Sequence, residues 1–162
     1  MALRIQNDLG LKLIEQIIWN KKTAMPITSK KHLTRSFENI FMYCFEDELH
    51  QNNEIFIYTN DREYKFNKKR SRVYNNYWEV RSNGIQKEGH QAVYPVEVPI
   101  KGIKLTTNKK DIVYDPFGGL GTTLIACEKT QRICYTVELS PLYCDNILER
   151  WEQFTGLKAK KI

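Results

Sequence analysis

The stretch "DPFGGLGTT", residues 115–123, decides how this chain folds, because it gathers three glycines between two segments of regular structure. The segment before it, "DIVY" (111–114), is short, apolar and typical of a buried strand. The segment after it, "LIACEK" (124–129), has the composition of a helix. A strand that runs through a glycine-rich turn into a helix predicts a ligand-facing turn at the carboxyl end of the strand.

The residues that follow extend this pattern to a second strand and a second helix. We expect a helix over 122–129, a strand over 132–137, and another helix that starts after Ser140. Serine is a good N-cap residue, and Pro141 then occupies a position at which helices tolerate proline. The sequence from 111 to 153 therefore predicts a βαβα unit.

The residue types in the turn indicate what it could hold. Glycines at 118, 119 and 121 let the backbone approach a ligand closely and adopt positive φ. Thr122 and Thr123 begin the following helix, whose free N–H groups favour a negatively charged group. The turn thus predicts a binding site.

An acidic residue, Glu138, ends the second predicted strand, where a carboxylate can bind both hydroxyls of a ribose. The turn and this acid together imply a nucleoside-bearing cofactor. NAD stays open, although the glycine spacing departs from G-x-G-x-x-G. A Walker P-loop is excluded, because the chain contains no Gly-Lys-Ser/Thr. The remaining alternative is a tight strand-to-helix turn without a ligand.

The composition predicts one main globular domain, since 162 residues, 41% of them hydrophobic, can bury one core. The apolar runs are far shorter than the ~20 residues that a membrane span needs, and the N-terminus lacks a secretory signal. The four cysteines have no C-x-x-C spacing, which favours reduced thiols over disulfides or a zinc site. We therefore expect a cytoplasmic protein without a metal site.

Positive charge is unevenly distributed along the chain. The net charge is +6, and basic residues gather in "KKTAMPITSKKHLTR" (21–35) and "REYKFNKKRSR" (62–72). Basic residues interleaved with aromatic ones favour contact with a phosphate backbone. Charge alone leaves a solvated basic face equally open.

The rest of the chain predicts two strands and an insertion. Strands are expected at "LKLIEQIIW" (11–19) and, as a buried strand, at "ENIFMYCF" (38–45). From about 46 to 89 the sequence is polar, charged and rich in Asn, which is typical of an insertion. Pro95 and Pro99 argue against a regular helix where they stand.

"DPFGGLGTT" resembles the Asp-Pro-Phe-x-Gly-Ser-Gly-Thr-Thr cofactor motif of the DNA methyltransferases that methylate adenine N6 or cytosine N4. "HQAVYPVEVP" (90–99) resembles the His-Pro-Ala-x-Phe-Pro segment that precedes this motif in the circularly permuted class. Segments that flank the family's target-recognition insertion are similar to "IIWNKK" (17–22), "RSFENIFMYCF" (35–45) and "NNYWEV" (75–80). The resemblance spans about 11–153.

The resemblance implies an α/β fold of the methyltransferase type, a Rossmann-like mixed sheet with flanking helices, and S-adenosylmethionine as the cofactor. Phe117 would pack on the adenine, Glu138 would bind the ribose hydroxyls, and the backbone of 115–121 would line the methionine portion. The implied cofactor-binding residues are Asp115, Pro116, Phe117, Gly118, Gly119, Gly121, Thr122, Thr123 and Glu138.

This chain departs from the family's pattern at three positions. Leu120 replaces the usual Ser, which removes one possible hydrogen bond to the cofactor. Gln91 replaces Pro after the histidine, and Tyr94 replaces Phe.

The resemblance also divides the chain into three parts and implies DNA as a partner. Residues 1–45 would end the catalytic half, 46–89 would be the target-recognition insertion, and 90–162 would bind S-adenosylmethionine. The insertion contains the expected DNA-binding residues, which would position DNA by its phosphates without reading its sequence: Lys68, Lys69, Arg70 and Arg72.

The family's catalytic motif, Asp/Asn/Ser-Pro-Pro-Tyr/Phe/Trp, has no counterpart in this sequence. In the family it accepts hydrogen bonds from the target amine and stacks an aromatic ring on the flipped base. The five prolines of this chain are isolated, so no catalytic residue is assigned. In the permuted order the motif would precede Leu11, with a central strand beside the cofactor strand.

Three explanations follow from the missing motif. The chain is one half of a split methyltransferase with a complementing polypeptide or self-association, a truncated remnant, or a non-catalytic DNA- or cofactor-binding module. The first is preferred, because the recognisable elements have not decayed.

Overall fold

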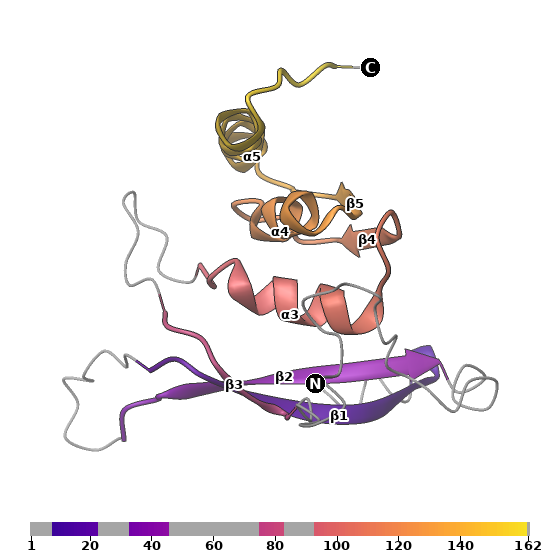
Figure 1. Cartoon of the computed structure of the whole chain (residues 1–162), viewed down its shortest axis with the longest axis vertical. Helices are drawn as coiled ribbons and strands as arrows, with labels where there is room; N and C mark the ends of the chain where they lie inside the picture. The colour runs from indigo at the N-terminus through magenta and orange to yellow at the C-terminus, as the bar shows by residue number, and fades with distance from the viewer. Residues whose placement is uncertain (1–7, 23–32, 46–74, 83–92, 162) are drawn as a thin grey trace, which may run out of the picture. The chain divides into compact units, whose positions relative to one another are not determined.

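The computed structural model describes residues 8–22, 33–45, 75–82 and 93–161 (Figure 1). The chain splits into two compact units, one of Met1–Phe56 with Arg62–Ser82 and one of Ile57–Asp61 with Asn83–Ile162. The predicted insertion, 46–89, lies largely outside the described residues. The three-part division of the chain therefore stays a prediction.

The first unit contains a three-stranded mixed sheet in the order β2-β1-β3. Its strands are β1 (Leu11–Asn20), β2 (Phe37–Phe45) and β3 (Tyr77–Glu79). β1 pairs antiparallel with β2, with an irregularity between Leu13 and Glu15, and parallel with β3. Both strands predicted in this region are thus confirmed.

The buried side chains of this unit come from β1 and from the β3 segment. They are Ile17, Trp19, Trp78 and Val80. Trp19 lies opposite Trp78 in the parallel register, and its indole Nε1 donates a hydrogen bond to the Val80 carbonyl over 2.8 Å. The two tryptophans therefore anchor the core of this unit, with the buried polar group satisfied.

The prediction that β2 is buried is wrong. None of its residues is buried, and Phe37, Phe41 and Phe45 are exposed. Among the described residues β2 lies at the edge of the sheet and pairs with β1 alone. The hydrophobicity of a strand predicts what it can bury, whereas its burial depends on what covers it.

The second unit contains the predicted βαβα pattern. β4 (Ile112–Asp115) leads into α4 (Thr122–Thr130), then β5 (Ile133–Thr136) and α5 (Pro141–Thr155). β4 and β5 pair in parallel, with Ile112 opposite Ile133, and α4 lies beside them (Figure 1). A parallel pair joined by a helix is the arrangement that places the turn after β4 at the carboxyl edge of the strands.

A further helix, α3 (Glu97–Thr106), precedes β4 and corrects the expectation drawn from Pro95 and Pro99. Pro99 is the third residue of this helix, where a backbone N–H has no acceptor within the helix, so the proline ring is tolerated. Pro95 lies before the helix, and its carbonyl accepts a hydrogen bond from the Val98 N–H over 3.0 Å.

α3 and α4 build the core of this unit against one face of the β4–β5 pair. Ile103, Ala126 and Cys127 are buried together, and Val113 and Cys134 pack against them. All four cysteines are free thiols, as the sequence predicted. None of the helices among the described residues has the length and apolarity to cross a membrane.

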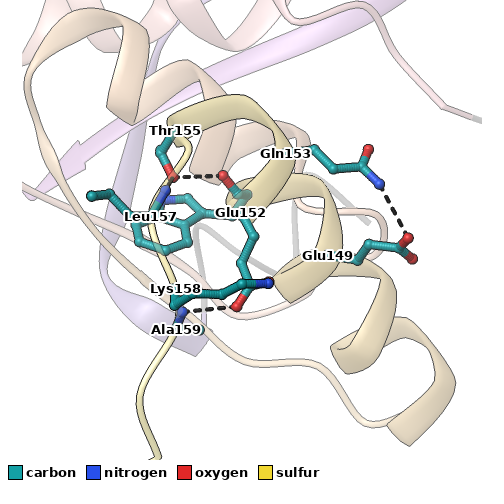
Figure 2. Close-up of polar contacts among 8 residues, drawn as sticks. Glu149, Glu152, Gln153, Thr155, Leu157, Lys158 and Ala159 are labelled. Atoms are coloured by element: carbon teal, nitrogen blue, oxygen red, sulfur yellow. Dashed lines mark hydrogen bonds and ion pairs between the residues drawn. The ribbon is translucent and has the colours of Figure 1, made fainter.

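The end of α5 is held by local hydrogen bonds (Figure 2). Gly156 has φ +73° and donates its N–H to the Glu152 carbonyl over 2.8 Å. The Glu152 carboxylate also accepts hydrogen bonds from Lys158 Nζ at 2.6 Å and from the Ala159 N–H at 2.9 Å. The glycine supplies the left-handed conformation that ends many helices.

Candidate functional site

A hydrogen bond joins the turn after β4 to the end of β5. Asp115 Oδ1 accepts a hydrogen bond from the Phe117 N–H over 3.0 Å, which turns the chain sharply. The Gly118 N–H donates to the Val137 carbonyl over 2.8 Å. These bonds fix the glycine-rich segment at the carboxyl edge of the two parallel strands, the place where open α/β sheets bind ligands.

Two glycines in this turn are required for different reasons. A Cβ on Gly118 would lie 2.5 Å from Thr136 Oγ1, so close packing excludes a side chain there. Gly121 has φ +71° and would also place a Cβ 3.2 Å from the Ile147 side chain. Both positions therefore favour glycine over any other residue.

Glu138 joins the turn to the start of α5. Its Oε2 accepts a hydrogen bond from the Gly119 N–H over 2.7 Å, and its Oε1 accepts one from the Ser140 N–H over 2.9 Å. Because an ionised carboxylate has about four acceptor positions, these bonds are compatible with further donors. The structure thus brings Glu138 to the turn, as the βαβα pattern predicts.

Ser140 and Pro141 occupy the N-cap and the first position of α5, as predicted. The Ser140 side chain makes no capping hydrogen bond.

The start of α4 is contacted from two other segments. Arg150 of α5 donates from Nη1 to the Leu120 carbonyl over 2.8 Å and to Thr122 Oγ1 over 3.3 Å. Tyr94 Oη lies 3.1 Å from Thr123 Oγ1. Burial lowers the pKa of Arg150, and burial raises the pKa of Tyr94 against the opposing effect of its hydrogen bond to Thr123.

Arg150 was not predicted to be part of the site. Only the structure places Ile147 beside Gly121, and Arg150, three residues later on α5, lies on the same face of that helix.

Two apolar side chains at the turn are almost fully exposed. Phe117 is 85% exposed and Leu139 is 97% exposed. They belong to the two segments that the Gly118 to Val137 hydrogen bond joins. Exposed apolar side chains beside a polar turn are suited to cover the faces of a flat ring. Phe117 was predicted to contact a ligand, whereas Leu139 was not.

The predicted DNA-binding residues Lys68, Lys69, Arg70 and Arg72 lie outside the described residues. Within the described ranges no three His, Cys, Asp or Glu side chains gather in a way that could hold a metal ion.

Comparison with known proteins identifies relatives whose sequences match nearly the whole chain. The type II methyltransferase M.Cfr9I of Citrobacter freundii is 32% identical over 150 residues, which are 93% of this chain and 47% of that protein. M.SmaI of Serratia marcescens is 30% identical over 150 residues, 93% of this chain and 49% of that protein. The chain therefore spans about half the length of these curated relatives.

Solved structures share the fold. The cytosine-N4-specific PvuII DNA methyltransferase matches with a TM-score of 0.70 and 17% identity over 93% of this chain and 55% of that one. M1.HpyAVI, solved in complex with SAM, matches with a TM-score of 0.64 and 22% identity over 88% of this chain and 64% of that one. The α/β fold is thus that of DNA methyltransferases.

The family model described as DNA methylase, N6_N4_Mtase, matches residues 1–149. With nearly the whole chain matched, this protein belongs to the DNA amino-methyltransferase family.

Proposed function

We propose that this chain binds S-adenosylmethionine and DNA as part of a DNA amino-methyltransferase, and that methyl transfer requires a catalytic segment with the Pro-Pro motif, which these 162 residues do not contain. The observation that carries this proposal is the turn from Asp115 to Gly121, which Glu138 joins to the start of α5. M1.HpyAVI, whose fold this chain shares, was solved with SAM bound, which supports the choice of cofactor.

Each part of the turn suits one part of this cofactor. Phe117 and Leu139 offer apolar surfaces for the adenine ring, and the Glu138 carboxylate can accept hydrogen bonds from the ribose hydroxyls. The N-terminus of α4, at Thr122 and Thr123, favours the negatively charged carboxylate of the methionine portion. The role of Asp115, Pro116 and the glycines is to bring the backbone close to the ligand.

The bound cofactor supplies the methyl group as a reactive sulfonium. This chain's residues orient that group and keep its adenosine in one position. Such orientation is effective only if the target amine is also held in position. In the family the Pro-Pro motif holds this amine, and this sequence does not contain that motif. The proposal therefore assigns no catalytic residue to this chain.

The catalytic segment is expected to cover β4. Among the described residues β4 pairs with β5 alone, and its Ile112 and Tyr114 side chains are 62% and 64% exposed. A strand with an open edge and exposed apolar side chains can accept another strand. We also propose that Lys68, Lys69, Arg70 and Arg72 contact DNA phosphates, and that the protein works in the cytoplasm, where free thiols persist.

The test is transfer of a radiolabelled methyl group to unmethylated DNA. The full chain is assayed alone and together with the part of M.Cfr9I that it does not match, expressed as a separate polypeptide. We expect no turnover by the chain alone and turnover by the mixture. Turnover by the chain alone would refute the need for the catalytic segment. DNA binding without any turnover in the mixture would favour the non-catalytic module.

A further inference from the structure

The start of α4 has no cap from its own side chains. Gly121 occupies the N-cap position and makes no side-chain hydrogen bond, and the helix begins with Ile125 N–H donating to the Gly121 carbonyl over 3.1 Å. Glycine is an acceptable N-cap residue, but it offers no side-chain oxygen to accept from the free N–H groups of the first turn. Side chains from other segments contact Leu120–Thr123.

Arg150 supplies one of these contacts from α5. Its Nη1 donates to the Leu120 carbonyl at 2.8 Å and to Thr122 Oγ1 at 3.3 Å, so one guanidinium nitrogen joins the last residues of the turn to the first residue of the helix. Thr122 itself is 3% exposed. Charged donors make stronger hydrogen bonds than neutral ones, and more so where water is excluded.

Tyr94 supplies the second contact, from the segment that precedes α3. Its hydroxyl lies 3.1 Å from Thr123 Oγ1. This hydroxyl is one of the departures of the chain from the family's pattern, which has Phe at this position. The departure therefore adds a hydrogen bond at the junction between turn and helix.

We propose that Tyr94 and Arg150 are positioning residues that hold Leu120–Thr123 in the geometry that receives the methionine end of the cofactor. The inference rests on the proposed function for its ligand. Arg150 holds the Leu120 carbonyl and the Thr122 hydroxyl, and Tyr94 holds the hydroxyl of the neighbouring Thr123. Their hydrogen bonds are to Leu120, Thr122 and Thr123, at the helix end of the turn, whereas Phe117 and Leu139 follow β4 and β5 at its strand end.

This placement predicts discrimination between two ligands. S-adenosylmethionine carries the methionine portion, whereas adenosine lacks it. Loss of either positioning residue is expected to weaken the binding of S-adenosylmethionine, because a neutral hydrogen bond contributes roughly fivefold to an equilibrium constant and a charged one tenfold or more. The affinity for adenosine should stay within about twofold of wild type. General destabilisation of the unit would weaken both ligands equally.

The experiment measures dissociation constants of both ligands for the full chain and for Tyr94→Phe, Arg150→Met and Arg150→Lys. We expect Kd for S-adenosylmethionine to rise about fivefold in Tyr94→Phe and about tenfold in Arg150→Met, with partial recovery in Arg150→Lys. Matched controls are Tyr135→Phe, an exposed tyrosine of β5, and Arg132→Lys, a buried arginine that donates to the Thr107 carbonyl over 2.7 Å. Equal losses for the two ligands would overturn the inference.

Hydrogen exchange of the Ile125 amide tests the same contacts without any ligand. Exchange is expected to be about fivefold faster in Tyr94→Phe and unchanged in Tyr135→Phe. If the wild-type chain binds no S-adenosylmethionine, the proposed function fails. The exchange rate of the Ile125 amide then tests by itself whether Tyr94 and Arg150 hold the start of α4. An unchanged Ile125 rate in both Tyr94→Phe and Arg150→Met would overturn their positioning role.

Discussion

Gly118 is the position at which the turn has the least space. A Cβ there would meet Thr136 Oγ1 at 2.5 Å and Ile147 Cδ1 at 3.3 Å. Neither neighbour can move without cost, since Thr136 ends β5 and Ile147 is buried on α5. The residue that fits the turn is therefore set by what lies beneath it, in addition to the conformation of its own backbone.

Gly118→Ala should accordingly destabilise the protein by about 1–3 kcal/mol, the usual range for overpacking. Urea unfolding of the two proteins measures this difference. Gly102→Ala is the matched control, because nothing lies within 4 Å of the added Cβ inside α3. The control should gain about 0.5–1 kcal/mol. Equal stability of Gly118→Ala and wild type would contradict the packing described here.

The Glu152 carboxylate provides a second test at this scale. Hydrogen bonds from Lys158 and the Ala159 N–H hold the pKa of Glu152 below its ordinary value. A lowered folded-state pKa stabilises the protein above the unfolded pKa of about 4.3, and this contribution is lost as the pH falls through the folded pKa.

Lys158→Ala should therefore raise the pKa of Glu152 toward its ordinary value. An NMR titration of the Glu152 side chain measures it directly. Lys161→Ala serves as the control and should leave the titration unchanged. A Glu152 pKa that is the same in Lys158→Ala and wild type would show that the contact between Lys158 and Glu152 does not persist in solution.

At the scale of elements, the sequence predicted the segments whose signals are local. The β4, α4, β5, α5 order follows from glycines, a serine cap and apolar runs that lie within the segments themselves. α3 was not predicted from the sequence. Proline disrupts the interior of a helix but is tolerated in its first turn, so the effect of Pro99 depends on where the helix begins. The exposure of β2 depends on other segments, so its own sequence could not predict it.

The residues of the candidate site also differ in whether their own sequence segment predicts them. Glu138 and the glycines lie within one recognisable motif, and the structure brings them together. Arg150 and Tyr94 reach the motif from 28 and 29 residues away along the chain. Contacts of this kind depend on how helices pack, which short sequence patterns do not encode.

The packing of α4 against α5 can be tested through one hydrogen bond. Trp151 Nε1 donates to Glu128 Oε1 over 2.8 Å, and Lys129 lies 5.6 Å from the centre of the Phe154 ring. Trp151→Phe should lower the free energy of unfolding by roughly 1 kcal/mol through loss of that bond.

A double-mutant cycle with Glu128→Ala isolates the hydrogen bond from other losses. Chemical unfolding of the four proteins should give a coupling energy of at least about 0.5 kcal/mol. Additive effects would mean that the two side chains do not interact.

At the scale of the whole molecule, the chain spans about half the length of its curated relatives and contains no Pro-Pro sequence. Family membership alone therefore does not give it an activity. The cofactor turn, in contrast, is built from residues within 93–161. This part of the chain can be tested for binding independently of methyl transfer.

DNA binding has its own test through salt. If Lys68, Lys69, Arg70 and Arg72 contact phosphates, their joint replacement by Ala should weaken DNA binding and flatten the dependence of log K on log salt by up to about 0.9 per lost contact. Fluorescence anisotropy over a salt series measures both. The double variant of Lys160 and Lys161 to Ala is the control for a general loss of charge. A slope that does not change would assign these four residues to a solvated face.

The most direct test of the central claim is calorimetric titration of the purified chain with S-adenosylmethionine, with Glu138→Gln beside it and Gly102→Ala as a folded control. The account predicts binding of one cofactor per chain by wild type and by Gly102→Ala, and an affinity at least about tenfold lower for Glu138→Gln, which loses a charged acceptor. Absence of binding by folded wild-type protein, or equal affinity in Glu138→Gln, would contradict it.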